Sequence, residues 1–588
     1  MSDASIRPRH PRPRSLPLVA PLRLGRPSDT WFKPALSVVA ASAVPQLTLL
    51  ALDRLDLVIY TMAGSLCALY GHGLPYARRA RTLAGVVLAM TAGLGAALVT
   101  ASLTHSTAVL VAVGALFAAV QKAGCDATRI GPPGHVILTF VSSAALFAPQ
   151  RPGQVPAHLA LTLAAGAVAW LVCVGPALIR REGPERRAVA RALAAAADRV
   201  ADPGPRTHRA AAAAVHAAWQ CLLSSGRPTP VRRSLERLVA HAEAAVTPSD
   251  AAPEAEADRL RGLAALTRGR GPVPVPPPPG PQGAYGTEHA ELYGIDAERA
   301  ALRDPGRRRR AARRALLRSL GPGSPLLPAA VRTLIGCALA GYLCVALGVG
   351  RPYWAIVTAA SLYQANITLT WNRTLQRTLG NLLGVLVFAA VLPLSRTAPL
   401  ALVLCCLFFG FAAEALITRN YWLGSVAVTP MALLVLEFGA PHPAGELIGD
   451  RVLDTVLGAL AGFLAAALVT NRRAAGRVER ALEATAKART EAERAAGRPP
   501  AERARARRAL TASLVELREA ADTAAGEWWQ RALPEQEVLA AEQAGHRTLT
   551  ATAQRPGPAA RAPPHPPGPT DPAPRLGGAV RRTSGALG

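Results

Sequence analysis

Two clusters of apolar residues, at 33–178 and 326–470, constrain the fold of this chain more than any other feature. Each cluster divides into runs of about 20 residues with few charges, which is the length that an α-helix needs to cross a bilayer. A soluble helix of that length would be amphipathic, with charged residues along its exposed face. The sequence therefore predicts an all-α membrane protein with many spans.

Six spans are expected in each cluster, or about 12 in all. Those of the first cluster fall near 33–52, 57–74, 82–102, 106–123, 135–149 and 157–179. Those of the second fall near 326–348, 352–369, 377–395, 398–416, 421–438 and 452–470. Because an even number of crossings returns the chain to the side on which it began, both halves have the same orientation. We therefore predict two parallel six-helix transmembrane halves with helical cytoplasmic segments and disordered termini.

A short sequence match supports this duplication. Residues 81–85 (RTLAG) open the third expected span, and residues 377–380 (RTLG) open the ninth. The two segments occupy the same place in their halves, so Arg81 and Arg377 are expected to be equivalent.

Composition divides the chain into six segments. They are a disordered basic N-terminus (1–30), the first membrane half (31–180), a cytoplasmic helical insert with a Pro-rich linker (181–325), the second membrane half (326–475), a cytoplasmic helical hairpin (476–553) and a disordered Pro-rich tail (554–588).

The formal net charge of +28 lies mainly outside the apolar runs. Arginines gather in loops that would share one side of the membrane, for example at 78–81, 180–181 and 373–377. This bias predicts that these loops and both termini are cytoplasmic, next to anionic lipids. No zinc spacing, recognition helix or aromatic-basic RNA motif accompanies the charge, so we expect no nucleic-acid partner.

Motifs for catalysis and cofactors are missing from the sequence. The eight cysteines show no C-x-x-C spacing, and most lie within apolar runs. No G-x-x-x-x-G-K-[ST] motif, paired aspartates for a diphosphate–magnesium site or His-rich metal motif is present. We expect no enzymatic activity, no metal and no cofactor.

The stretch from Pro352 to Leu386 contains the most unusual pattern. One apolar run is followed by polar residues 369–377, which we interpret as a hairpin, and then by a second run. Arg373, Arg377, Gly380 and Gly384 recur at helical spacing and therefore share one face. The two glycines form a G-x-x-x-G motif, which allows two helix backbones to approach closely in lipid.

Four motifs in the second half resemble the fusaric acid resistance (FUSC) family of membrane transporters. They are Pro352-Tyr353-Trp354, then Arg377-x-x-Gly380 with Gly384, then Asn420-Tyr421 ahead of Thr429-Pro430, then Arg451-x-x-Asp454-Thr455-x-x-Gly458. The resemblance covers about 330–475 and extends to 33–180 only in architecture. It implies a bacterial cytoplasmic membrane protein that exports small organic acids, often aromatic ones.

Candidate residues for a substrate path follow from the chemistry of an organic anion. Arg377 and Arg81 are the first candidates to attract a carboxylate, with Arg373 one turn earlier. The alternative is that these arginines only fix the topology and extend to the membrane interface.

Other polar and aromatic residues in the spans could contact the same substrate. Tyr353 and Trp354 could stack on an aromatic acid or belong to an interfacial aromatic belt. Gln364, Asn366 and Asn381 are costly to expose to lipid and are expected to face the bundle interior.

Glu414 is the candidate coupling acid. An ionisable side chain inside a span has a high free-energy cost, so it is a functional candidate by default. Pairing with Arg419 is the alternative. An anion-channel-like pathway and a non-transporting membrane scaffold remain the alternatives to export, and a homo-oligomer is left open.

Overall fold

The computed structural model describes residues 17–25, 31–225, 229–245, 253–274, 306, 310, 324, 326–469, 474–527 and 534–554. Every regular element within these ranges is an α-helix or a short 3-10 helix, which confirms the all-α prediction. Eight of the helices are long and apolar enough to cross a membrane.

The two membrane halves contain corresponding helices. The first half consists of α1 (Phe32–Ala51), α2 (Val58–Ser65) with the 3-10 helix η3 (Leu66–Leu69), α3 (Tyr76–Leu103), α4 (Thr107–Thr128), α5 (Val136–Leu146) and α6 (Val155–Val174). The second consists of α13 (Leu327–Ala346), α14 (Pro352–Leu362), α15 (Ile367–Ser395), α16 (Pro399–Ile417), α17 (Tyr421–Glu437) and α18 (Ala444–Leu468). In both halves the second and fifth helices are shorter than the other four. The eight long helices are the membrane-span candidates, and a layout of 12 full spans stays a prediction.

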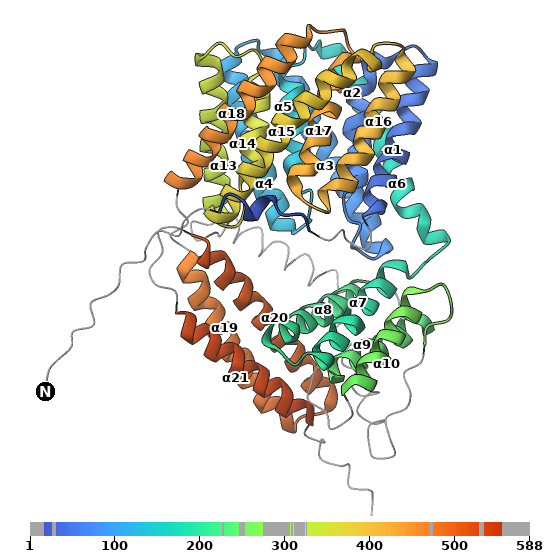
Figure 1. Cartoon of the computed structure of the whole chain (residues 1–588), viewed down its shortest axis with the longest axis vertical. Helices are drawn as coiled ribbons and strands as arrows, with labels where there is room; N and C mark the ends of the chain where they lie inside the picture. The colour runs from blue at the N-terminus through green and yellow to red at the C-terminus, as the bar shows by residue number, and fades with distance from the viewer. Residues whose placement is uncertain are drawn as a thin grey trace, which may run out of the picture.

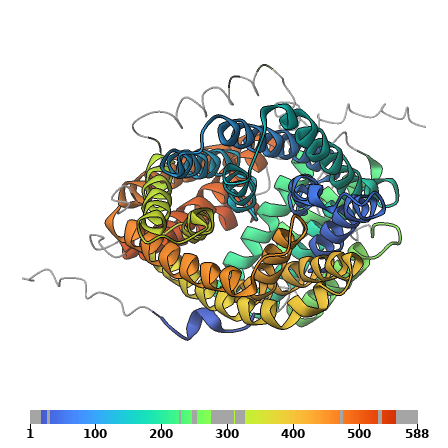
Figure 2. The same ribbon diagram turned by 90° about the horizontal axis from the view of Figure 1, so that it is seen from above.

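The pattern of helix–helix contacts repeats between the halves, as the pattern of helix lengths does. In each half the second helix packs on the sixth, and the third packs on the fifth and the sixth. Across the halves α1 packs on α16, and α13 packs on α4 in the corresponding way. Seen from above, the first half (blue to teal) and the second half (yellow to orange) face each other across the bundle (Figure 2). This arrangement fits a parallel duplication.

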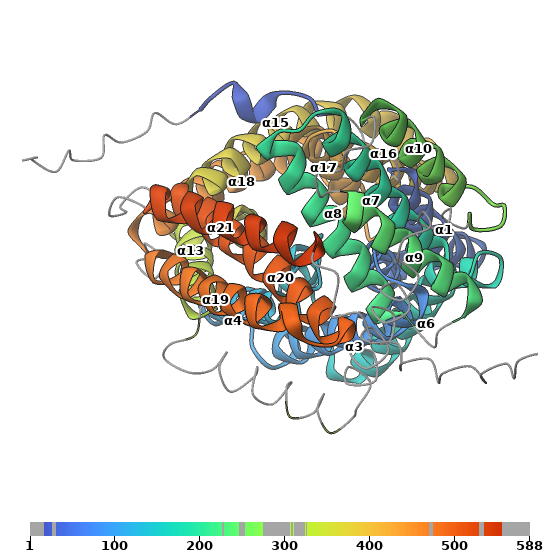
Figure 3. The same ribbon diagram turned by 90° about the horizontal axis from the view of Figure 1, so that it is seen from below.

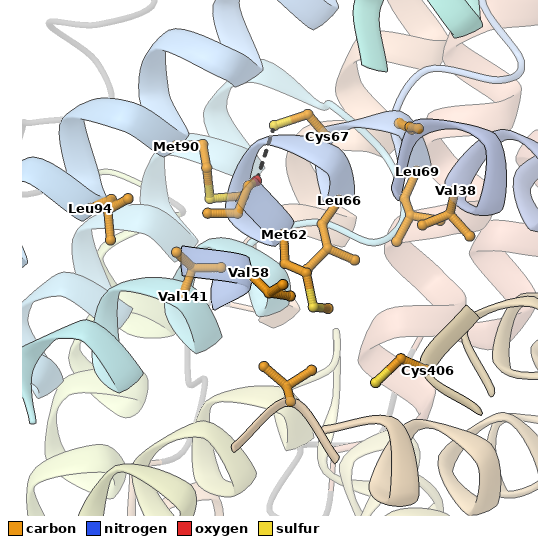
Figure 4. Packing of buried hydrophobic residues seen from close by; sticks show 14 of the residues in the cluster. Val38, Val58, Met62, Leu66, Cys67, Leu69, Met90, Leu94, Val141 and Cys406 are labelled. Atoms are coloured by element: carbon orange, nitrogen blue, oxygen red, sulfur yellow. Dashed lines mark hydrogen bonds between the residues drawn. The ribbon is translucent and has the colours of Figure 1, made fainter. Parts of the chain in front are cut away.

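Large apolar side chains cover the outside of the bundle as well as its interior. Leu88, Leu386, Phe408 and Leu460 are more than 60% exposed, at 64%, 67%, 63% and 63%. Such a surface is unfavourable in water and suits contact with lipid. Inside, one cluster joins both halves; Figure 4 shows part of it, with Val58 and Met62 of α2, Val141 of α5 and Cys406 of α16.

The soluble helices lie together at one end of the bundle (Figure 1). The first group is α7 (Gly183–Ala201), α8 (Pro205–Ser224), α9 (Pro230–Ala245) and α10 (Pro253–Arg268). The second is α19 (Ala474–Arg494), α20 (Pro500–Ala525) and α21 (Glu535–Gln554). The third helix of this second group was not expected, because the sequence indicated only a hairpin. The groups meet where α20 packs on α8 (Figure 3).

The polar stretch 369–377 is not a hairpin, as the sequence suggested, but the beginning of the long helix α15. Asn366 caps this helix by accepting a hydrogen bond from the backbone N–H of Leu369 at 2.8 Å. Thr370 and Thr374 then bond back to carbonyls one turn earlier, which allows polar side chains within the helix.

Residues 17–25 also differ from the expectation of disorder for 1–30. They contain the 3-10 helix η1 (Ala20–Leu22), whose backbone carbonyls accept side-chain hydrogen bonds from the bundle. Gln376 donates to the carbonyl of Pro21 at 2.7 Å, and Trp422 donates to that of Leu22 at 3.2 Å. The rest of the expected N-terminal disorder, most of the Pro-rich linker and the tail beyond Gln554 lie outside the described residues.

Candidate functional site

Close contact between α15 and α17 positions the central polar side chains. A Cβ atom at Gly380 would lie 2.5 Å from the carbonyl oxygen of Trp422, and one at Gly384 would lie 2.8 Å from that of Val426. Only glycine permits this approach, as the G-x-x-x-G motif predicted. The face that carries Arg373 and Arg377 is therefore held directly against the first turn of α17.

Tyr421, the first residue of α17, contacts both arginines of that face. The centre of the Arg373 guanidinium lies 3.3 Å from the centroid of the Tyr421 ring, a cation–π contact. Nη1 of Arg377 donates a hydrogen bond to the Tyr421 hydroxyl at 2.9 Å. The Nε atoms of both arginines are buried without a hydrogen-bond partner among the described residues.

A third arginine, Arg451 of α18, lies deeper in the bundle and is 1% exposed. Its guanidinium lies over the Trp354 ring, 4.0 Å from the ring centroid, and its charge interacts with that of Arg377. Its Nε and Nη1 have no hydrogen-bond partner within the described part of the chain. We call Arg373, Arg377 and Arg451 the arginine row.

The arginine row lacks close ion pairs with carboxylates in the described part of the chain. Among the described residues, none of its three members forms an ion pair within 4.0 Å. Asp454, one turn from Arg451, interacts electrostatically with it and also accepts a hydrogen bond from the Cys344 thiol at 3.4 Å. Three arginines beside one carboxylate leave an excess of positive charge, so an anion that entered this region would be stabilised.

Two other buried arginines show what a purely structural role looks like. Arg79 donates to four backbone carbonyls around the start of α3, including those of Gly71 at 2.9 Å and Cys173 at 3.2 Å. Arg332 donates from Nε and Nη2 to the carbonyl of Val469 at 3.0 and 2.7 Å. Their N–H groups donate hydrogen bonds to backbone carbonyls, which distinguishes these two arginines from the arginine row.

A cavity lies between the halves, beside Trp354. The four short helices α2, α5, α14 and α17 supply most of its lining, together with α3. Its aromatic walls include Tyr60, Phe140, Tyr353 and Trp354. The walls are largely apolar, so the cavity suits the hydrophobic part of a ligand.

The aromatic walls from the second helix of each half are both backed by a basic side chain. Tyr60 is stacked on His158 of α6, with ring centroids 3.7 Å apart and an interplanar angle of 11°. Trp354 is covered by Arg451 of α18, the corresponding helix of the second half. Tyr60 and Trp354 are each the third residue of a corresponding helix, which extends the duplication to the cavity.

Four of the predicted residues lie in the same region as Arg451. They are Arg373, Arg377, Tyr353 and Trp354. Arg81 lies elsewhere: it is exposed on α3, and its Nε donates to the carbonyl of Ala77 at 3.2 Å. The halves are therefore not equivalent at this position.

The predicted amides have different surroundings. Asn381 connects three helices, since it donates to Thr455 at 3.2 Å and accepts from Thr429 at 2.9 Å. Asn366 is buried, but as the cap of α15. Gln364 is half-buried in the turn between α14 and α15.

Glu414 is half-buried in α16, one turn from its end. Within the described residues no ion pair joins it to exposed Arg419. Its carboxyl group therefore lacks the partner that the pairing alternative required.

Sequence reasoning missed Arg451, Tyr421 and His158 as site residues. The available signal was that Arg451 and Tyr421 belong to motifs that resemble the fusaric acid resistance family. Among the described residues, no group of three or more His, Cys, Asp or Glu side chains is placed to hold a metal.

The fold is that of a helical membrane protein with several candidate spans, and the arginine row is a candidate cationic site within its bundle. Residues 333–465 match the family described as fusaric acid resistance protein-like, which confirms the resemblance in the second half. A stretch of 151 residues is 28% identical to the uncharacterized membrane protein YvaC of Bacillus subtilis (strain 168). That stretch is 25% of this chain and 24% of the relative, so the match spans about a quarter of either protein. No solved structure matches the chain significantly.

Proposed function

We propose that this chain is a transporter that exports small organic anions, in particular aromatic carboxylates, across the bacterial cytoplasmic membrane. The observation that carries the proposal is the arginine row, in which buried Arg377 and Arg451 and half-buried Arg373 form no ion pair within 4.0 Å among the described residues. The match to the fusaric acid resistance protein-like family supports a transporter.

Binding would begin at the end of the bundle that faces the soluble helices. Arg373 and Arg377 lie within the first three turns of α15, which starts at that end. Guanidinium groups bind carboxylates through charge-assisted hydrogen bonds. Because both cations already contact Tyr421, an aromatic substrate would exchange one favourable contact for another and would not be held too tightly for release.

Deeper in the bundle Arg451 would take over the carboxylate, while the apolar body of the substrate entered the cavity beside Trp354. The aromatic rings in the wall of that cavity, together with its aliphatic side chains, would contact the body of the substrate. Glu414 is our candidate proton-coupling group, because its carboxyl group has no ion-pair partner in the described part of the chain.

The orientation in the membrane rests on charge. Arg81 near the start of α3 and the loop residues Arg180 and Arg419 belong to the end of the bundle where the soluble helices lie. The positive-inside bias supports a cytoplasmic location for that end and, in our proposal, for both termini.

Proteoliposomes provide the test. They would be loaded with radiolabelled benzoate or with an aliphatic acid of similar size, and efflux would be compared for wild type, Arg377→Ala and Arg81→Ala at equal protein content. We expect Arg377→Ala to lower benzoate efflux about tenfold or more, since a charged hydrogen bond contributes about 1.5–3 kcal/mol. Arg81→Ala is the matched control and is expected to transport normally. Equal rates for all three proteins would refute a path along the arginine row.

A further inference from the structure

Four basic side chains gather where the first membrane half continues into the soluble helices, at the end of the bundle where α6 leads into α7 (Figure 1). They are Lys33 near the start of α1, Arg79 near the start of α3, Arg180 just before α7 and Arg187 in the second turn of α7. The charge of Lys33 interacts with the charges of all three arginines. We call these four residues the junction cluster.

The start of α7 brings these cations close to one another. A Cβ atom at Gly183 would lie 3.5 Å from the Tyr76 hydroxyl, 3.6 Å from Nη2 of Arg187 and 3.7 Å from Cβ of Arg180. The Arg79 guanidinium lies 4.9 Å from the centroid of the Tyr76 ring. Burial, together with the charges of Arg79 and Arg180, lowers the pKa of Arg187. Because like charges repel at this range, an anion among them would be stabilised.

The carboxylates beside the start of α7 do not form ion pairs with the junction cluster. Glu185 pairs with Arg232 of α9 at 3.4 Å and accepts a hydrogen bond from Ser225 at 3.0 Å. It affects the charge of Arg79 only from beyond 4.0 Å. Glu182 has no ion-pair partner in the described part of the chain. Four cations beside these two carboxylates leave an excess of positive charge.

Most of the N–H groups on three members of the cluster remain available to a ligand. Within the described residues the Lys33 ammonium donates no hydrogen bond. Arg180 donates from Nη2 to the carbonyl of Gly269 at 3.1 Å, and Arg187 donates from Nε to that of Gly183 at 3.1 Å. Phosphate oxygens accept several charge-assisted hydrogen bonds at once, which suits such a set of donors.

Exposed apolar side chains directly precede two of these cations. Leu178 and Ile179, just before Arg180, are 87% and 88% exposed. Trp31 and Phe32, just before the cation of α1, are 37% and 40% exposed. Aromatic rings at this position are typical of the membrane interface. The surface therefore fits a molecule with long apolar chains and a negatively charged head.

We propose that the junction cluster binds the phosphate group of an anionic phospholipid, with the acyl chains of the lipid along Leu178 and Ile179. Basic pockets beside membrane helices bind anionic lipid headgroups in this way. The bound lipid would contact both α1 and the start of α7, and would attach the first group of soluble helices to the membrane surface. The arginine row takes no part in this site.

Native mass spectrometry of the full chain in detergent micelles tests the proposal, because it resolves individual bound lipids. The probe is dioleoyl phosphatidylglycerol, and dioleoyl phosphatidylcholine, with the same chains and no net charge, is its control. We expect Lys33→Gln to weaken the tightest phosphatidylglycerol site about tenfold or more, and Lys33→Arg to retain it. Lys33→Gln removes no hydrogen bond between described residues, so the fold should be unaffected.

Two double variants with equal loss of charge separate this site from general attraction to anionic lipid. Arg180→Gln/Arg187→Gln is expected to abolish the preference for phosphatidylglycerol. Arg78→Gln/Arg81→Gln, which removes two exposed charges from the same end of the bundle, is expected to keep it.

Further arms identify the ligand. Ile179→Ser keeps every charge and is expected to weaken the binding of both lipids. Glycerol phosphate, which has the phosphate without the acyl chains, should not displace the lipid. Arg377→Ala is expected to bind lipid like the wild type, so failure of the transport path would leave the result intact.

Three outcomes would overturn the proposal. They are unchanged phosphatidylglycerol binding in both Lys33→Gln and Arg180→Gln/Arg187→Gln, an equal loss in Arg78→Gln/Arg81→Gln, and binding of glycerol phosphate as tight as that of the lipid. The last of these would indicate a site for a soluble phosphate compound.

Discussion

Among single residues, the buried arginines show that burial alone does not define a site. Arg79 and Arg332 donate to backbone carbonyls and so stabilise the chain where helices begin or end. Arg377 and Arg451 instead contact aromatic rings or hydroxyl groups and keep buried N–H groups without partners in the described structure. The partners, and not the residue type, separate structural arginines from candidate binding residues.

Asn381 should contribute more to stability than to transport. Asn381→Ala removes its hydrogen bonds to Thr429 and Thr455, but both hydroxyls keep a bond to a backbone carbonyl of their own helix. We expect a loss of about 1 kcal/mol in the free energy of unfolding, typical of interhelical bonds in membranes. Thermal unfolding in detergent measures this loss, and benzoate efflux is expected to stay near the wild-type rate. Strongly reduced efflux at unchanged stability would return Asn381 to the substrate path.

At the level of elements, glycine faces determine which helices can carry the site. Gly380 and Gly384 bring α15 against α17, while Gly458 and Gly462 bring α18 against Ala355 and Ala359 of α14. Arg377 and Arg451 are positioned by these two contacts. A change in either packing would move a guanidinium without touching it.

Gly380→Ala is expected to disturb both stability and efflux. The added Cβ would lie 2.5 Å from the Trp422 carbonyl oxygen, and overpacking of this kind costs about 1–3 kcal/mol. The matched control is Gly85→Ala in α3, where no atom lies within 4 Å of the new Cβ. That control should be neutral or stabilising, by up to about 1 kcal/mol, because alanine favours helices. Unfolding midpoints that fall equally in both variants would contradict the close packing of α15 on α17.

In the whole molecule, α20 connects the cavity between the two groups of soluble helices to the membrane bundle. Arg507 and Arg508 lie in its first half, and beyond its last residue the carbonyl of Gly526 accepts hydrogen bonds from the backbone and the hydroxyl of Thr368, at 3.1 and 2.8 Å. Asn366 donates to the carbonyl of Asp522 at 3.4 Å. These contacts attach the helix to the start of α15, two turns before Arg373.

The contact between α8 and α21 should depend on pH through His546. Its pKa falls from an ordinary 6.5 to about 4 on folding, because of burial and the nearby His208 and Arg209. The unfolded state therefore binds more protons between these values, so stability is complete above about pH 6.5 and declines toward pH 4. Thermal unfolding of the wild type and of His546→Gln, each measured at about pH 7.5 and about pH 5, should show a smaller pH effect in the variant. The exposed His105→Gln is the control, and equal pH effects in all three proteins would contradict the prediction.

The sequence by itself determined the class of fold and the approximate positions of the eight candidate membrane spans, because apolar run length is a local property. It also identified the face of Arg373, Arg377, Gly380 and Gly384, since helical spacing depends only on position along the chain. It did not reveal that residues 369–377 continue the helix, because a cap and backbone-bonded threonines offset their polarity.

Only the tertiary structure decided which candidates meet. Arg81 and Arg377 are alike in sequence context, yet only Arg377 packs against a tyrosine inside the bundle. Arg451 joins the site from a position more than 70 residues after Arg377. The cavity between the two groups of soluble helices likewise combines residues of α8 with residues of α21. Such combinations arise from the packing of distant segments. No local pattern of residues encodes them.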